Sequence, residues 1–156
     1  MTVRAWRIVK AKHSAAAFSG SGAKQFGGRW NSPGVAAVYV AGSASLAILE
    51  MLVHLQSQEL MRCYVIFEVT FDEALVTAVD PAALPRNWRK SPPPAVAQQI
   101  GDAWFADAAS AVLRVPSALV PTECNYLLNP LHPGFAEITI RPKQSVRFDP
   151  RLIRIS

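Results

Sequence analysis

The 156-residue sequence is poor in cysteine, in charge and in long apolar runs. Its two cysteines, Cys63 and Cys124, form neither a disulfide framework nor a CxxC metal pair, so we expect free thiols in a reducing compartment. Only 17% of the residues are charged while 51% are hydrophobic, which excludes a disordered chain and predicts a buried core. The most apolar region, residues 35–55, contains Gly42 and Glu50, so we expect no membrane span there.

The first ten residues, MTVRAWRIVK, lack the apolar stretch of a secretory signal, so a cytoplasmic protein is expected. The length suits a single domain over residues 1–156. The formal charge of +5 would allow a nucleic-acid partner. However, the basic residues are scattered apart from one cluster, RNWRK at 86–90, and most of them are arginines, which grip phosphate with a planar fork. A small anionic substrate therefore explains the excess as well as nucleic acid does.

The hydrophobic pattern predicts an α+β fold with short strands and two main helices. We expect strands at 2–9, 35–41, 62–71 and 75–79, two more within 111–120, and terminal strands at 135–141 and 146–148. Helices are expected at 44–56, with Ser43 as the N-cap, and from 93 to 107. Loops are expected at 10–34, 80–94 and 125–133. Because no alternating βαβ pattern, GxGxxG or Walker motif is present, a Rossmann or P-loop fold is disfavoured.

Residues 19–34, SGSGAKQFGGRWNSPG, contain five glycines and predict a backbone that turns tightly or approaches a ligand closely. Two interpretations of GGRWN, residues 27–31, stay open. The segment is either a turn that anchors Trp30 in the core, or an anion-binding loop in which Arg29 grips a phosphate.

Four polar residues lie in otherwise apolar surroundings. Glu50 interrupts an apolar helix and lies either on an exposed face or toward a cleft, because burying an unpaired carboxylate is costly. Tyr39 is either a core residue or a ring that stacks on a flat group. Arg7, in the first strand, is expected to meet an acid or a phosphate. Ser117 follows a proline but lacks the GxSxG elbow, so it is not expected to be a hydrolase nucleophile.

Eight segments occur in a characteristic order: WRI (6–8), SGxGA (19–23), FGGRWN (26–31), VYV (38–40), SxxxAILExLVHL (43–55), VPSALVP (115–121), NYLLNPLHP (125–133) and the tail at 138–148. Together they resemble the RES domain, the toxin of RES–Xre toxin–antitoxin systems, and the resemblance extends over nearly the whole chain. The resemblance implies short-stranded sheets with flanking helices, similar to the ADP-ribosyltransferase (diphtheria-toxin-like) fold. It also implies depletion of cellular NAD by cleavage of the nicotinamide–ribose bond, and growth arrest. The alternatives are mono-ADP-ribosylation of a cellular protein and, from another class, a nucleic-acid-binding toxin.

The resemblance assigns catalytic roles to Glu50, Arg7 and Tyr39. Glu50 is expected to stabilise positive charge on the ribose, as carboxylates do in glycoside cleavage. Arg7 is expected to bind the pyrophosphate, and Tyr39 to stack on the nicotinamide or its ribose.

Binding of the NAD substrate is assigned by the same resemblance to Arg29, Asn31, Ser117 and Asn125. NAD is expected as substrate, without a prosthetic group or a metal. The expected partner is an Xre-type helix-turn-helix antitoxin, with the toxin dimeric in the complex. Contact with nucleic acid is expected only through the antitoxin, and no membrane partner is expected.

Overall fold

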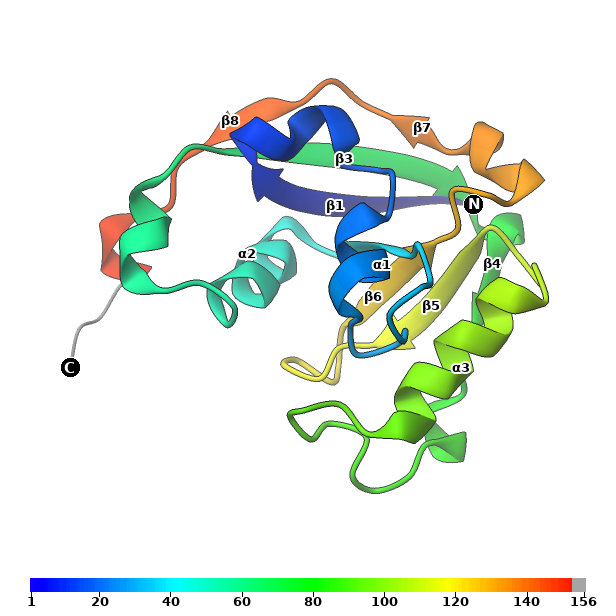
Figure 1. The fold of residues 1–156 in the computed structure, drawn as a ribbon. Helices are drawn as coiled ribbons and strands as arrows, with labels where there is room; N and C mark the ends of the chain where they lie inside the picture. Colours follow the sequence, from blue (N-terminus) through cyan, green and yellow to red (C-terminus); the bar gives the residue numbers. More distant parts are fainter. Residues whose placement is uncertain (153–156) are drawn as a thin grey trace.

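The computed structural model describes residues 1–152, so the last four residues of the predicted domain lie outside it. The strands form one curled sheet in the order β4-β5-β6-β2-β1-β3-β7, and β8 also pairs with β3 (Figure 1). Their bounds are β1 (Thr2–Lys10), β2 (Val38–Ala41), β3 (Tyr64–Asp72), β4 (Val76–Ala78), β5 (Val112–Pro116), β6 (Cys124–Leu128), β7 (Thr139–Ile140) and β8 (Gln144–Val146).

The sheet is weakly joined at its centre. β1 and β3 pair along nine residues, whereas β1 and β2 share the single register pair Trp6 and Ala41. The sheet therefore divides into a half made of β1, β3, β7 and β8 and a half made of β2, β6, β5 and β4, which diverge in Figure 1. The junction lies at the end of β2, just before the chain enters α2.

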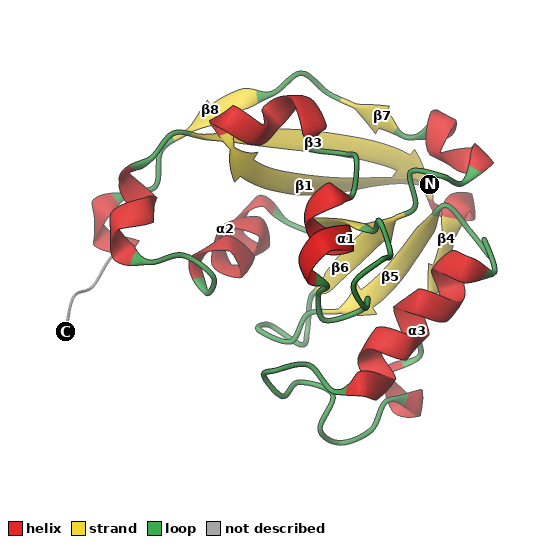
Figure 2. Cartoon of the chain, viewed as in Figure 1, coloured by secondary structure: helices red, strands yellow, loops and turns green. Residues whose placement is uncertain are grey.

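The helices lie beside the two halves (Figure 2). They are α1 (Ser21–Phe26), α2 (Ala44–Leu52) and α3 (Ala95–Ala106), with 3-10 helices at Ala11–Ala16, Ser57–Met61, Glu73–Leu75, Pro81–Ala83, Pro133–Glu137 and Pro150–Leu152. No helix within residues 1–152 is long and apolar enough to cross a membrane.

Each main helix buries an apolar face against the sheet. Leu46 and Ala47 of α2 pack on Ile8 of β1 and Ala41 of β2. Ala97 and Trp104 of α3 pack on buried side chains of β5 and β6, among them Leu113 and Leu127. Burial of a large apolar side chain stabilises a fold by roughly 1.5–3 kcal/mol, so these contacts fix the helices relative to the strands.

The predicted α+β class and several elements are confirmed. The strands at 2–9, 62–71 and 75–79 lie within two residues of the expected positions, as does the start of the helix at 93–107. Ser43 is the N-cap of α2, and its Oγ accepts a hydrogen bond from the backbone N–H of Leu46 at 3.0 Å. Capping of this kind satisfies one of the orphan donors of the first turn.

Other expectations are corrected by tertiary packing. The helix expected at 44–56 ends at Leu52 with Val53 as its C-cap, and Gln56 is the extended N-cap of the next 3-10 helix. The strand at 35–41 begins only at Val38, and residues 10–34 contain a 3-10 helix and α1 instead of a continuous loop. Residues 111–120 contain one strand instead of two, and the loop expected at 125–133 begins with most of β6, which is held between β2 and β5.

The C-terminal strands also differ from expectation. Residues 135–141 begin in a 3-10 helix and contribute only the two-residue strand β7, while the strand expected at 146–148 lies two residues earlier, at 144–146. The proline at position 133 starts that 3-10 helix, since its fixed φ suits a first helical turn.

Candidate active site

Glu50, Ser117 and Asn125 form a hydrogen-bonded group that we call the carboxylate cluster. Glu50 lies on α2, Ser117 directly follows β5, and Asn125 lies on β6. Ser117 Oγ donates to Glu50 Oε1 at 2.9 Å, and Asn125 Nδ2 donates to the same oxygen at 2.8 Å. Both donors act on one oxygen, so they orient the carboxylate and leave Oε2 without a hydrogen bond to residues 1–152. Glu50 is thus partly buried and paired with neutral donors instead of a cation.

The two donors differ in their surroundings. Ser117 is 0% exposed, and its Oγ also accepts from the backbone N–H groups of Leu119 and Val120 at 3.2 and 3.1 Å. Its side chain is therefore buried and fully hydrogen-bonded, and its expected contact with NAD stays a prediction. Asn125 Oδ1 is buried and has no hydrogen-bond partner within the described residues. An unpaired buried acceptor costs about 1–3 kcal/mol, so orientation of the amide toward Glu50 is achieved at the expense of stability.

Arg7 bridges the two halves of the sheet where they diverge. Its Nε donates to the carbonyl of Ala17 at 2.6 Å, and its Nη1 donates to the carbonyl of Tyr39 at 2.9 Å. Burial lowers the pKa of Arg7 to about 10, so the guanidinium keeps its charge at neutral pH. Within residues 1–152 no acid forms a salt bridge with it, so of the acid and the phosphate expected as partners the phosphate stays a prediction. Arg7 is a partly buried cation held by carbonyl groups.

Tyr39 holds the GGRWN loop through its hydroxyl. Its Oη accepts from the backbone N–H of Trp30 at 3.1 Å and donates to Asn31 Oδ1 at 2.5 Å. Burial raises the pKa of the Tyr39 hydroxyl, which keeps it protonated as a donor. A Cβ at Gly28 would lie 2.7 Å from this hydroxyl, so only glycine fits at that position. The tyrosine thus has a scaffold role, with its ring still partly exposed.

Asn31 and Trp30 anchor the same loop from inside. Asn31 is 0% exposed, and its Nδ2 donates to the carbonyls of Ala23, Ser32 and Val35 at 3.0, 3.1 and 3.1 Å. Trp30 is 2% exposed. The interpretation of GGRWN as a turn with Trp30 in the core is confirmed. The Asn31 side chain is buried and bonded within the loop, and its expected contact with NAD stays a prediction.

Helix α3 supports the GGRWN loop, and the sequence did not predict this contact. The carboxylate of Asp102 accepts from the backbone N–H of Ser32 at 2.8 Å. A Cβ at Gly101 would overlap the carbonyl oxygen of Trp30, so a glycine lets the helix approach this closely. The available signal was a glycine inside a predicted helix, a position that commonly has a packing reason.

Arg29 extends from the loop to a distant segment. Its Nη1 donates to the carbonyls of Trp88 and Lys90 at 2.9 and 2.8 Å, an arrangement that we call the arginine clamp. Burial lowers the pKa of Arg29, while the negative charge of Glu50 opposes that shift. The guanidinium therefore lies near enough to Glu50 to feel its charge, but its bonds hold a loop. The structure shows Arg29 attached to a loop through backbone carbonyls, and its expected contact with NAD stays a prediction.

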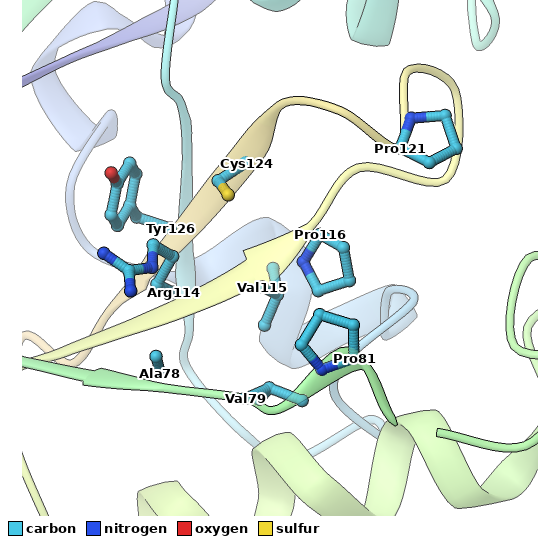
Figure 3. A pocket seen from close by; sticks show the side chains of 9 residues that line it. All are labelled: Ala78, Val79, Pro81, Arg114, Val115, Pro116, Pro121, Cys124 and Tyr126. Atoms are coloured by element: carbon cyan, nitrogen blue, oxygen red, sulfur yellow. The ribbon is translucent and has the colours of Figure 1, made fainter. Parts of the chain in front are cut away.

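A hollow of about 400 Å³ lies elsewhere, over β4, β5 and β6 (Figure 3). Arg114, Cys124 and Tyr126 line it, and the last two flank Asn125 in β6. Because successive side chains of a strand point to opposite faces, this hollow is on the other side of the sheet from the carboxylate cluster. None of the residues expected at the site lines it.

Comparison with known proteins gives a consistent result. The RES domain family matches residues 4–149. The protein named Toxin Res from Yersinia enterocolitica serotype O:8 / biotype 1B (strain NCTC 13174 / 8081) is 42% identical over 149 residues, covering 94% of this chain and 97% of the relative. A protein named Prs ADP-ribosylating toxin from Sphingobium sp. (strain YBL2) is 42% identical over 159 residues, covering 99% of both chains.

One solved structure shares the fold. A chain in the crystal structure of the M. tuberculosis MbcT–MbcA toxin–antitoxin complex superposes with a TM-score of 0.78 at 20% identity. The match covers 97% of this chain and 87% of that chain. The curled sheet with flanking helices is therefore an arrangement shared with a chain of distant sequence.

Proposed function

The chain belongs to the RES domain family, and we propose that it is a toxin that stops growth by cleaving the nicotinamide–ribose bond of NAD. The observation that carries the proposal is the carboxylate of Glu50, fixed through one oxygen by Ser117 and Asn125. Of the two arginines expected at the site, Arg29 lies near enough to Glu50 for the two charges to interact, and Arg7 bonds to the carbonyl of Tyr39. The names of the curated relatives, Toxin Res and an ADP-ribosylating toxin, support a toxin that acts on NAD.

In the proposed reaction the bond between the nicotinamide nitrogen and ribose C1′ breaks, and its electron pair leaves with nicotinamide. The leaving group departs neutral, so no strong general acid is needed. Positive charge develops on the ribose, as in glycoside cleavage. Glu50 stabilises this charge through Oε2, the oxygen that the cluster leaves free. Electrostatic stabilisation by a preoriented group is typically worth on the order of 100-fold in rate.

The other residues act around that carboxylate. Arg7 supplies a partly buried positive charge for the pyrophosphate, which is a dianion at neutral pH. The partly exposed ring of Tyr39 stacks on nicotinamide or its ribose. Ser117 and Asn31 position Glu50 and the GGRWN loop, respectively, since both side chains are buried. A nucleophile then attacks C1′ and loses its proton to solvent.

If a protein side chain accepts the ADP-ribose group, the reaction is mono-ADP-ribosylation of a cellular protein, which is the second candidate function. The relative named Prs ADP-ribosylating toxin, which matches along nearly the whole chain, favours this alternative. Incubation of the purified protein and a cell lysate with NAD labelled in its adenylate part separates the two. Free ADP-ribose or its phosphate ester indicates NAD depletion, whereas a labelled protein band indicates transfer to protein.

We also propose an Xre-type helix-turn-helix antitoxin as the partner, with the toxin dimeric in the complex. The structural neighbour from a toxin–antitoxin complex supports an antitoxin of some kind. Co-expression with a candidate antitoxin tests this, since the two chains should co-purify and the complex should leave NAD intact.

The direct test of the function is inducible expression with cellular NAD measured over time. Wild-type protein should deplete NAD before growth stops, and Glu50→Gln should do neither while accumulating as folded protein. Growth arrest at normal NAD would refute NAD depletion, and the labelled-lysate experiment would then decide on protein modification.

A further inference from the structure

The loop of residues 86–90, RNWRK, gathers three positive charges around an open hollow of about 470 Å³. Arg86, Asn87, Arg89 and Lys90 line this hollow, so every lining side chain is either a cation or an amide. The three cations are exposed, and within the described chain none of them forms a salt bridge. Like charges gathered without acids repel one another, and they attract anions from solution.

The same loop contacts the GGRWN loop through Arg29 and Trp30, and it contacts the segment after Ser117 through Arg89. Arg29 donates to the carbonyls of Trp88 and Lys90. Arg89 Nε donates to the carbonyl of Ala118, the residue after Ser117, at 2.9 Å. The rings of Trp88 and Trp30 lie 6.0 Å apart between centroids. In Figure 1 this loop and the loop after β5 lie side by side at the same end of the molecule.

We propose that residues 86–90 form an anion subsite that binds the phosphate groups of a ligand of the Glu50 site. The inference rests on the proposed function for the identity of that ligand, but not for anion binding itself. Arginine forks and a neighbouring amide suit phosphate oxygens, which accept several hydrogen bonds at once. The phosphate belongs either to NAD, as its pyrophosphate, or to a phosphorylated acceptor of ADP-ribose.

The first measurement is the binding of inorganic pyrophosphate to the purified protein by calorimetry at low salt. The double variant Arg86→Gln/Lys90→Gln removes two lining charges and keeps the Lys90 carbonyl that Arg29 uses. The control, Lys12→Gln/Arg141→Gln, removes one lysine and one arginine from exposed positions outside this loop. We expect Kd to rise about tenfold in the loop variant and to stay within twofold in the control, because each exposed charge adds modestly to affinity.

Kinetics then distinguish the source of the phosphate. If the subsite holds the NAD pyrophosphate, inorganic pyrophosphate inhibits competitively against NAD, and KM for NAD rises in the loop variant. If it holds the acceptor, KM for NAD is unchanged, while transfer to protein in a lysate falls about tenfold as docking of the acceptor weakens.

Equal pyrophosphate binding by wild type, loop variant and control overturns the subsite. An equal weakening in the loop variant and the control would show adventitious binding to surface charges only, and it overturns the subsite as well. This outcome is separate from failure of the proposed function. If the wild-type protein releases no nicotinamide, the NAD reaction is refuted. If pyrophosphate binding is at the same time weakened only in the loop variant, the anion subsite still stands.

Discussion

The carboxylate cluster and the arginine clamp flank the same site but are built differently. In the cluster, side chains of α2, β6 and the end of β5 bond to one another, and Ser117 is wholly buried. In the clamp, the side chain of Arg29 bonds to the backbone of a loop, and its partners belong to an exposed, basic segment.

This difference teaches which part is fixed and which part can adjust. Groups on packed helices and strands are held more precisely than groups on loops. The cluster is therefore suited to stabilising a charge that develops during reaction, which affects kcat. The clamp is suited to holding substrate, which affects KM.

The largest expected effect comes from removing the charge of the cluster. Glu50→Gln keeps the shape and an acceptor oxygen for both donors, but it should lower kcat by about 100-fold or more. Nicotinamide release under saturating NAD measures this. Glu73→Gln, an exposed acid on the 3-10 helix after β3, serves as the matched control and should keep the wild-type rate.

A smaller loss in kcat should follow removal of either donor. Ser117→Ala and Asn125→Ala each leave Glu50 charged but less firmly oriented, and each should lower kcat by about tenfold, the value of one hydrogen bond to a charged group. The fold-loss in kcat of the double variant should be smaller than the product of the two single fold-losses, because both donors act on one oxygen. Independent, fully multiplicative losses would argue against a single cluster.

Disruption of the clamp should change KM instead. Arg29→Gln removes the charge and one or both bonds to the loop, so KM for NAD should rise about fivefold while kcat stays within twofold. Arg29→Lys is informative beside it: lysine keeps the charge but lacks the fork, and only partial rescue is expected. A purely catalytic Arg29 would instead show its loss in kcat.

The smallest effect concerns pH and Arg7, which lies between the two sheet halves. Its pKa of about 10 means that KM for NAD should double near pH 10 if only the charged form binds the pyrophosphate. An unfolded arginine keeps its proton to a higher pH than folded Arg7 does, so the folded protein holds fewer protons between the two pKa values. The contribution of Arg7 to the free energy of unfolding therefore increases with pH between these two pKa values. Deprotonation of Arg7 does not itself unfold the protein. The inflection should vanish in Arg7→Gln; circular dichroism over the same range reports the fold.

The sequence could predict much of this arrangement. Apolar periodicity located α2, with Ser43 as its cap, and the ordered motifs located Glu50, Arg7 and Tyr39. Charge inside an apolar segment is costly unless satisfied, so the positions of Glu50 and Arg7 stood out before their partners were known.

Other features depend on contacts between distant residues and left no local signal. The bonds from Arg29 span 59 and 61 residues, and those from Asn125 and Ser117 to Glu50 span 75 and 67. Strand β6 is ordered by its neighbours β2 and β5 despite its turn-like flanks. Burial of the Ser117 and Asn31 side chains likewise follows from packing alone.

The most direct test compares Glu50→Gln and Arg29→Gln with wild type in one steady-state assay of nicotinamide release. We predict that the first variant loses kcat by about 100-fold, and that the second raises KM with kcat nearly unchanged. Both variants should keep the wild-type circular dichroism spectrum. Wild-type turnover by folded Glu50→Gln would contradict the central claim that this carboxylate stabilises the charged ribose.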